Sequence, residues 1–130
     1  MIELLKDKTN SIALIGASND ESKYGFKILL DLKHKGHEVL PINTKEHEIQ
    51  GIKVHKDVKE IAECPSIINF VVPPGVGFEI TKDLVANGYD NFWYQPGAES
   101  EEISNFLKSE NKNYIDDKCI MVVAGLIDNY

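Results

Sequence analysis

Arginine is missing from this sequence, and all fourteen of its cationic side chains are lysines. A site that binds phosphate must therefore use lysine charges, hydroxyl groups and backbone N–H groups in place of the bidentate guanidinium fork. Acidic residues also outnumber the lysines, so the formal net charge is -7 and the pI is near 5.0. Nonspecific nucleic-acid binding needs a basic face that displaces phosphate counterions, so we expect no nucleic-acid partner.

Cysteine is scarce as well, with Cys64 and Cys119 far apart in the sequence. They form no C-x-x-C pair and no matching histidine spacing accompanies them, so we expect neither a zinc site nor a disulfide framework. Acidic residues interrupt the first eleven positions, which predicts no signal peptide and no membrane anchor. The composition, 42% hydrophobic and 27% charged over 130 residues, predicts a cytoplasmic protein with one domain spanning 1–130.

Short β-branched apolar runs alternate with amphipathic stretches, a rhythm typical of repeated β-α units. The predicted strands are 12–15, 39–42, 67–72 and 91–94, and the segments 113–115 and 120–123 complete the core. The predicted helices cover about 26–35, 57–62, 79–87 and 99–110, with an irregular connection over 44–56. This order predicts an α/β fold of three layers, Rossmann-like and doubly wound around a mainly parallel sheet of about five strands.

Ligands of such sheets lie outside the carboxyl ends of the strands, which directs attention to the loops that follow them. After the first strand, Gly16 permits a tight turn, and Ala17 and Ser18 are small enough for a phosphate to approach. The dinucleotide fingerprint G-x-G-x-x-G is broken, because Ser18 and Glu21 replace its second and third glycines. A plain strand-to-helix turn also needs small residues, so this loop alone leaves both interpretations open.

The loop after the second strand carries Asn43, Thr44 and Lys45, where an NAD-binding domain would place a carboxylate for the ribose hydroxyls. Lys45 favours a ligand with an additional phosphate, such as NADP or the 3′-phosphate of coenzyme A. A lysine in a loop is also commonly just solvated, and the sequence does not separate these two interpretations.

Rigid turns follow the next two strands, at Val72-Pro73-Pro74 and at Gln95-Pro96-Gly97. These turns can line a groove with apolar surface and a hydrogen-bonding amide, or they can simply terminate strands. Trp93 and Tyr94 alternate along one strand, which predicts that one of them lies in the core. The four histidines, at positions 34, 37, 47 and 55, are expected at the surface. No catalytic motif is present, so no catalytic residue is predicted.

Taken in order, the segments IALIGASN, KYGFKILLDLKHKGHEVLPINTK, IINFVVPPG, FWYQPGA and DDKCIMV resemble stand-alone coenzyme A-binding proteins. These are similar to the CoA-binding domain of the succinyl-CoA synthetase α subunit, and the resemblance covers about 10–123. It implies a Rossmann-like fold that holds coenzyme A across the carboxyl edge of the sheet. Two departures are Ser22-Lys23, where many relatives carry arginine, and Thr44, which replaces the proline of Asn-Pro-Lys.

The resemblance also implies a set of cofactor-binding residues. They are Gly16, Ala17 and Ser18 at the pyrophosphate with Lys23 and Tyr24 nearby, Asn43 and Lys45 at the adenosine phosphate end, Val72, Pro73 and Pro74 along the adenine or pantetheine groove, and Gln95 at the pantetheine arm. Cys119 matches the family's cysteine position and is implied to lie near the coenzyme thiol, which suggests a mixed disulfide as a hypothesis.

The leading interpretation is a protein that binds coenzyme A or an acyl-CoA without catalysis of its own. The synthetase uses a phosphohistidine in a further domain and a partner subunit, so ligase activity is not expected. One alternative is an NAD- or NADP-binding regulator or small oxidoreductase on the same fold. Another is an interaction subunit of a larger acyl-CoA enzyme, with a protein partner docking on exposed helix faces or on the tail after Val123.

Overall fold

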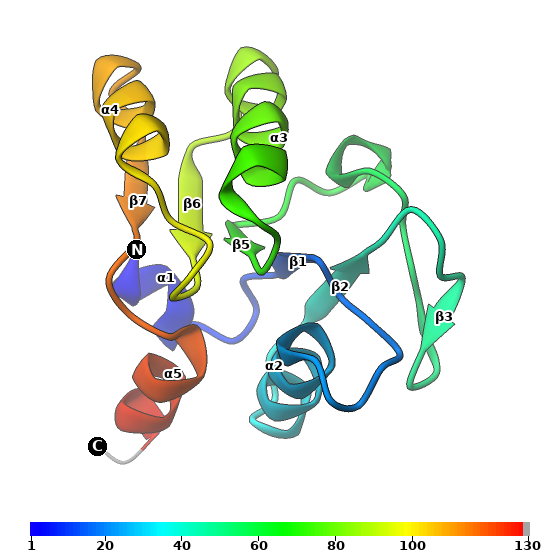
Figure 1. Cartoon of the computed structure of the whole chain (residues 1–130). Helices are drawn as coiled ribbons and strands as arrows, with labels where there is room; N and C mark the ends of the chain where they lie inside the picture. Colours follow the sequence, from blue (N-terminus) through cyan, green and yellow to red (C-terminus); the bar gives the residue numbers. More distant parts are fainter. Residues whose placement is uncertain (129–130) are drawn as a thin grey trace.

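The computed structural model describes residues 1–128 and has three layers, a sheet between two layers of helices (Figure 1). The sheet has five strands in the order β2-β1-β5-β6-β7, and every neighbouring pair is parallel. The strands are β1 (Ile12–Ile15), β2 (Val39–Ile42), β5 (Ile67–Phe70), β6 (Asn91–Tyr94) and β7 (Asn113–Ile115). The Rossmann-like, doubly wound fold predicted from the sequence is confirmed.

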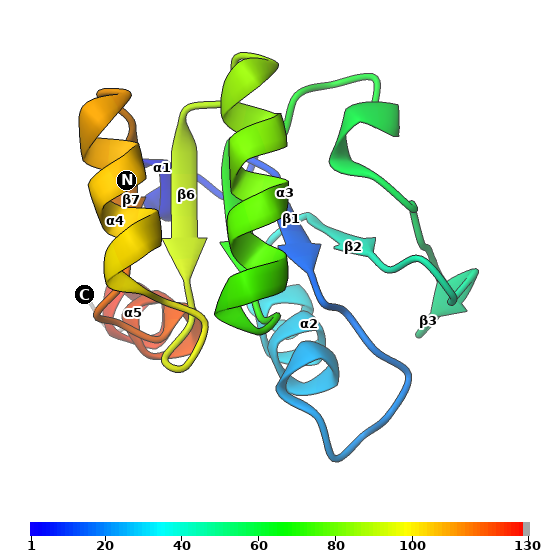
Figure 2. The same cartoon turned by 45° about the horizontal axis from the view of Figure 1, so that its top comes forward.

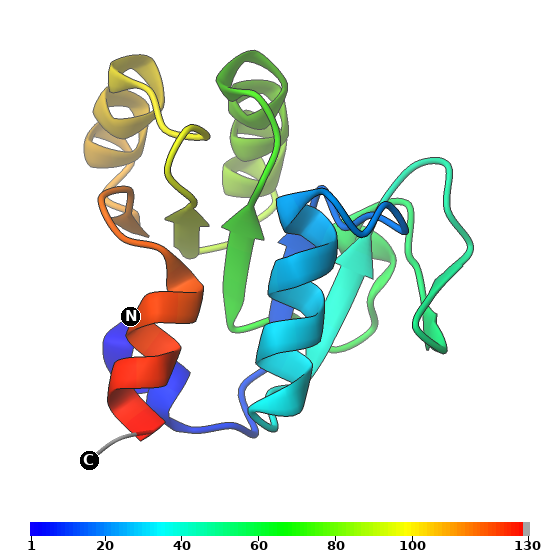
Figure 3. The ribbon, with the colours of Figure 1, turned by 60° about the horizontal axis from the view of Figure 1, so that its bottom comes forward.

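Helices cover both faces of this sheet (Figures 2 and 3). The helices are α1 (Ile2–Lys6), α2 (Tyr24–His34), α3 (Pro74–Ala86), α4 (Glu101–Ser109) and α5 (Ile120–Asp128), and the 3₁₀ helix η1 spans Val58–Glu60. Residues of α1, α2 and α5 share one apolar cluster with one face of the sheet, and residues of α3, α4 and η1 share a second cluster with the other face. None of the helices within residues 1–128 is both long enough and apolar enough to cross a membrane.

The central strands are buried on both faces, which explains their continuous apolar sequences. The same coverage corrects the prediction for Trp93 and Tyr94, of which only one was expected in the core. Both are fully buried, Trp93 in the cluster beneath α2 and α5 and Tyr94 in the cluster beneath α3. The Tyr94 hydroxyl group has a buried partner in the Thr81 hydroxyl, 2.7 Å away.

Several segments differ from the sequence-based expectation. The run 120–123 does enter the core, but as the first turn of α5 and not as a strand, because a short apolar run fits a buried strand and a buried helix equally well. Within 44–56, β3 (Glu48–Ile49) and β4 (Ile52–Lys53) form a hairpin. Gln50 and Gly51 at its turn both have positive φ, as a tight hairpin turn requires.

Helix α3 begins at Pro74, five residues before the predicted start at 79. Proline is well tolerated in the first helical turn because its missing N–H would have no partner there, so Pro74 can open the helix. Strand β5 already ends at Phe70, two residues before its predicted end at 72. Helix α4, over Glu101–Ser109, agrees closely with the predicted range of about 99–110. Ser100 caps it, because the Ser100 hydroxyl accepts a hydrogen bond from the Ile103 N–H at 3.1 Å. Asp57 caps η1 through the Lys59 N–H in the same way.

His37 is buried, with 6% of its surface exposed, so the prediction of a surface histidine is wrong. Helix α2 ends in a Schellman motif, in which the His37 N–H donates to the Leu32 carbonyl and the Gly36 N–H to the Lys33 carbonyl. Gly36 adopts the positive φ of this motif. The residue after the glycine commonly packs back on the helix, and here it is His37. Burial lowers the pKa of His37, and the nearby Lys8 charge lowers it further.

This burial predicts a pH dependence of stability. Because the folded-state pKa of His37 lies below its ordinary value of 6.5, the unfolded chain binds more protons as the pH falls through that value, and stability decreases. In urea unfolding, His37→Gln should therefore show a smaller loss of unfolding free energy between pH 7.5 and 5.5 than the wild type. His34→Gln, which changes the exposed histidine that ends α2, serves as control. Equal losses in all three proteins would contradict this account of His37.

Candidate functional site

The strand order reverses at β1, with β2 paired on one side and β5 on the other. In open parallel sheets a ligand crevice lies outside the carboxyl ends of the strands at such a switch point. A pocket of about 480 Å³ is found at this edge. Six of the predicted site residues line it, namely Tyr24, Val72, Pro73, Pro74, Gln95 and Cys119, together with Val71, Pro96, Gly97 and Ala98. The remaining predicted residues lie outside its lining.

The loop after β1 passes close to the end of β5. Gly16 has a φ of +100°, and a Cβ added there would lie 3.0 Å from the Val72 side chain and 3.2 Å from the Val71 carbonyl group. A residue with a side chain would thus be strained and crowded. Ala17, which follows, is fully buried, and the Ser18 hydroxyl accepts a hydrogen bond from the Asp20 N–H at 3.0 Å. Gly16 therefore makes the tight turn that the sequence predicted.

Helix α2 starts directly against this loop, and the contact depends on Gly25. A Cβ added at Gly25 would lie only 2.0 Å from the Gly16 carbonyl oxygen. Close packing of the helix on the strand is the role of the third glycine of the dinucleotide fingerprint. The fingerprint spacing points to Glu21 for that glycine and misses Gly25, because the loop between strand and helix is longer than the fingerprint allows. A glycine in the first helical turn was the available signal.

Two of the helices that begin beside the site, α2 and α3, carry no side-chain cap. The side chains of Lys23, which precedes α2, and Pro73, which precedes α3, form no hydrogen bond to the first turn of the helix, whereas α4 has its Ser100 cap. N-terminal N–H groups without a capping side chain, aligned with the helix dipole, form a ready anion site. Lys23 is exposed beside them, and the Lys27 ammonium lies 5.5 Å from the centre of the exposed Tyr24 ring.

Asn43 holds two loops of this edge together. Its side-chain N–H donates to the Ala17 carbonyl at 2.7 Å, and its side-chain oxygen accepts the Lys45 N–H at 2.7 Å. Asn19 adds a second tie by donating to the Glu46 carboxylate at 2.5 Å and the Glu48 carbonyl at 2.9 Å. Asn43 thus positions the loop after β1, while the exposed Lys45 is carried on the turn that Asn43 shapes.

Gln95 connects the pocket to α5. Its side-chain oxygen accepts the Ile120 N–H at 2.9 Å, which caps the helix, and its Nε2 donates to the Cys119 sulfur at 3.1 Å. The Trp93 indole N–H donates to the Lys118 carbonyl at 2.8 Å, just before the helix. Gln95 is 5% exposed, and its two polar groups link the pocket to Cys119 and to the first residue of α5.

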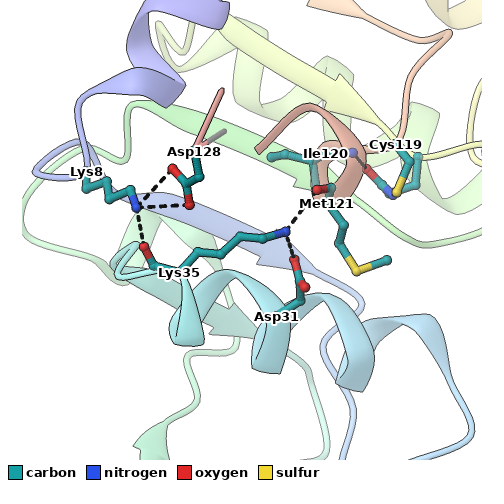
Figure 4. A network of polar contacts seen from close by, with 8 residues as sticks. Lys8, Asp31, Lys35, Cys119, Ile120, Met121 and Asp128 are labelled. Carbon is teal, nitrogen blue, oxygen red and sulfur yellow. Dashed lines mark hydrogen bonds and ion pairs between the residues drawn. The ribbon is translucent and has the colours of Figure 1, made fainter. Parts of the chain in front are cut away.

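Helix α5 is also tied to α2 and to the segment after α1 (Figure 4). The Lys35 ammonium reaches the Asp31 carboxylate at 2.6 Å and the Met121 carbonyl at 3.0 Å. Lys8 pairs with Asp128 at 3.1 Å and also donates to the Lys35 carbonyl. The helix is therefore fixed near both of its ends.

Comparison with known proteins connects this chain to a family of ligand-binding domains. The family described as CoA binding domain matches residues 10–125. The chain belongs to this family. The resemblance inferred from the sequence is thereby confirmed, while the contacts of individual residues with a ligand remain predictions.

The relatives include both single domains and longer chains. A structure of a conserved hypothetical protein from Pyrococcus furiosus has a TM-score of 0.84 at 48% identity, covering 87% of this chain and 97% of that one. A subunit alpha of an ADP-forming acetate–CoA ligase, also from Pyrococcus furiosus, is 46% identical over 48% of this chain and 14% of its own length. The acetate–CoA ligase of Methanocaldococcus jannaschii is 32% identical over 80% of this chain. This chain spans 15% of that ligase's length.

The close contact between Gly25 and Gly16 predicts that alanine at position 25 lowers the stability of the protein, whereas alanine at position 75 does not. Gly25→Ala should lower the unfolding free energy by about 3 kcal/mol or more, because backbone atoms must move to accommodate the methyl group. Gly75→Ala is the matched control, since it also lies in the first turn of a helix but an added Cβ there has nothing within 4 Å. It should be neutral or stabilising by up to about 1 kcal/mol. Denaturant unfolding of both variants measures the difference, and similar stabilities would refute the packing argument.

Proposed function

We propose that this chain binds coenzyme A at the carboxyl edge of its sheet. The observation that carries the proposal is the arrangement there, where the helix N-terminus without a side-chain cap at α2 adjoins a pocket that leads to a cysteine. Membership of the CoA binding domain family supports this ligand. The proposed role is binding. The ligase reaction named for the relatives is a property of much longer chains.

The pyrophosphate of the coenzyme lies in this proposal at the first turn of α2. The loop after β1 and the helix start meet through Gly16 and Gly25, so backbone N–H groups can approach a phosphate without an intervening side chain. Lys23 supplies positive charge beside them. This assignment agrees with the absence of arginine, because the phosphate is held by backbone dipoles and lysine.

The adenosine end with its 3′-phosphate lies near Lys45. The ammonium of Lys45 is exposed and its backbone N–H is held by Asn43, which fixes the turn that carries it. The pantetheine arm takes the other direction, into the pocket walled by Val72, Pro73 and Pro74. Its thiol end then reaches Cys119, which Gln95 holds in place.

Calorimetric titration of the reduced protein with coenzyme A, dephospho-coenzyme A, NADP and NAD tests this proposal. Coenzyme A should bind most tightly, and removal of the 3′-phosphate should weaken binding about tenfold, as expected for loss of a charged contact. Lys45→Glu should weaken coenzyme A binding by at least that factor but change dephospho-coenzyme A binding much less. Lys108→Glu, the same charge reversal on α4, is the control.

Several outcomes would contradict the proposal. Absence of coenzyme A binding would remove it altogether. Tighter binding of NADP or NAD would favour the dinucleotide alternative. Equal effects of Lys45→Glu on both coenzymes would show that the turn after β2 lies away from the 3′-phosphate.

A further inference from the structure

A second hollow lies alongside α5, on the side of α1. We call it the α1–α5 groove, with a volume of about 680 Å³. Its apolar lining is provided by Ile2 of α1 and by Val122, Val123, Leu126 and Ile127 of α5. Val122 and Leu126 are 61% and 55% exposed, an unusual exposure for side chains one helical turn apart. Apart from Cys119 at its end, the proposed binding of coenzyme A uses none of the residues that line this groove.

The groove and the carboxyl-edge pocket meet at one residue. Cys119 lines both hollows, and it is the residue directly before α5. Its sulfur is fixed by Gln95 from the pocket side, and Lys118 and Asp117 continue the wall on the groove side. A ligand whose thiol end reaches Cys119 from the pocket therefore arrives at the mouth of the groove.

We propose that the α1–α5 groove binds the acyl chain of an acyl-CoA whose coenzyme part occupies the carboxyl-edge pocket. This inference rests on the proposed function and specifies its ligand as a thioester with a chain of medium length. The thioester lies beside Cys119, the adenosine and pantetheine parts extend toward α2, and the chain runs along Val122 and Leu126.

The side chains that line the groove favour an uncharged, linear ligand. Its walls are aliphatic, and the two lysines at its rim are already paired, Lys6 with Glu3 at 3.0 Å and Lys118 with Asp117 at 3.0 Å. These pairs leave no concentrated charge for a carboxylate, whereas a hydrocarbon chain gains from every methylene that it removes from water. The ties of α5 to Lys35 and Lys8 keep one wall in place without ligand.

A chain-length series tests the inference. Free coenzyme A and its acetyl, hexanoyl and decanoyl thioesters are titrated into the protein by calorimetry, below the concentrations at which the thioesters form micelles. Acetyl-CoA should bind about as tightly as free coenzyme A. Affinity should then rise about twofold or more per methylene through the decanoyl thioester.

Matched variants test whether the chain-length dependence of the affinity arises in the α1–α5 groove. Val122→Asn and Leu126→Gln should each flatten the chain-length dependence and leave the affinity for free coenzyme A unchanged, because neither residue lines the carboxyl-edge pocket. Val76→Asn makes the same substitution at an exposed valine of α3 that lines neither hollow, and it should keep the dependence. Both sets of changed side chains are largely exposed, so folding should be retained.

Alkylation by iodoacetamide, followed by peptide mass analysis, gives an independent measurement on the wild type. Decanoyl-CoA should protect Cys119 but not Cys64, which is exposed and serves as the internal reference. A flat affinity series, a dependence that survives both groove variants, or a dimer that Val122→Asn dissociates would overturn the inference while coenzyme A still binds. Failure of all four ligands to bind would instead overturn the proposed function.

Discussion

The contact between the Gly25 backbone and the Gly16 carbonyl is the constraint on which the rest of this site depends. With 2.0 Å between that oxygen and the position a Cβ would take, only glycine lets α2 begin against the loop after β1. The contact brings the first turn of α2 to the switch point of the sheet, where β1 lies between β2 and β5. Asn43 then secures the loop from the other side through the Ala17 carbonyl. A helix dipole and a rigid loop are thereby joined at one edge.

The opposite end of the site is organised by a side chain, not by backbone contact. Gln95 joins the end of β6 to the start of α5, and it holds the Cys119 sulfur with the same amide that caps the helix. Because α5 is also tied to α2 by Lys35, these two of the three helices on this face of the sheet are linked to each other. The pocket and the α1–α5 groove therefore have walls that are set by the fold before any ligand binds.

Much of the fold could be predicted because buried parallel strands leave a clear signal, as in 12–15, 39–42 and 91–94. Helix starts were harder, since Pro74 looks like a strand terminator but opens a helix, and the apolar run 120–123 fits two structures. In the candidate site, the sequence indicated loops that the structure brings to one edge of the sheet, but it could not show what each polar group contacts. Gln95 and Asn43 bond to distant backbone groups, and the pairing of Gly25 with Gly16 is a contact in space that the fingerprint spacing does not reveal.

The central claim is that coenzyme A lies across the loop after β1 and the start of α2. The most direct measurement is a titration of the isotope-labelled protein with coenzyme A, monitored by the backbone amide signals in two-dimensional NMR spectra. The account predicts the largest shifts at the amides of Ala17, Ser18, Tyr24 and Gly25, with smaller shifts at Gly97 and Cys119. Shifts confined to the opposite edge of the sheet, around Asn113 and Gly88, would contradict it.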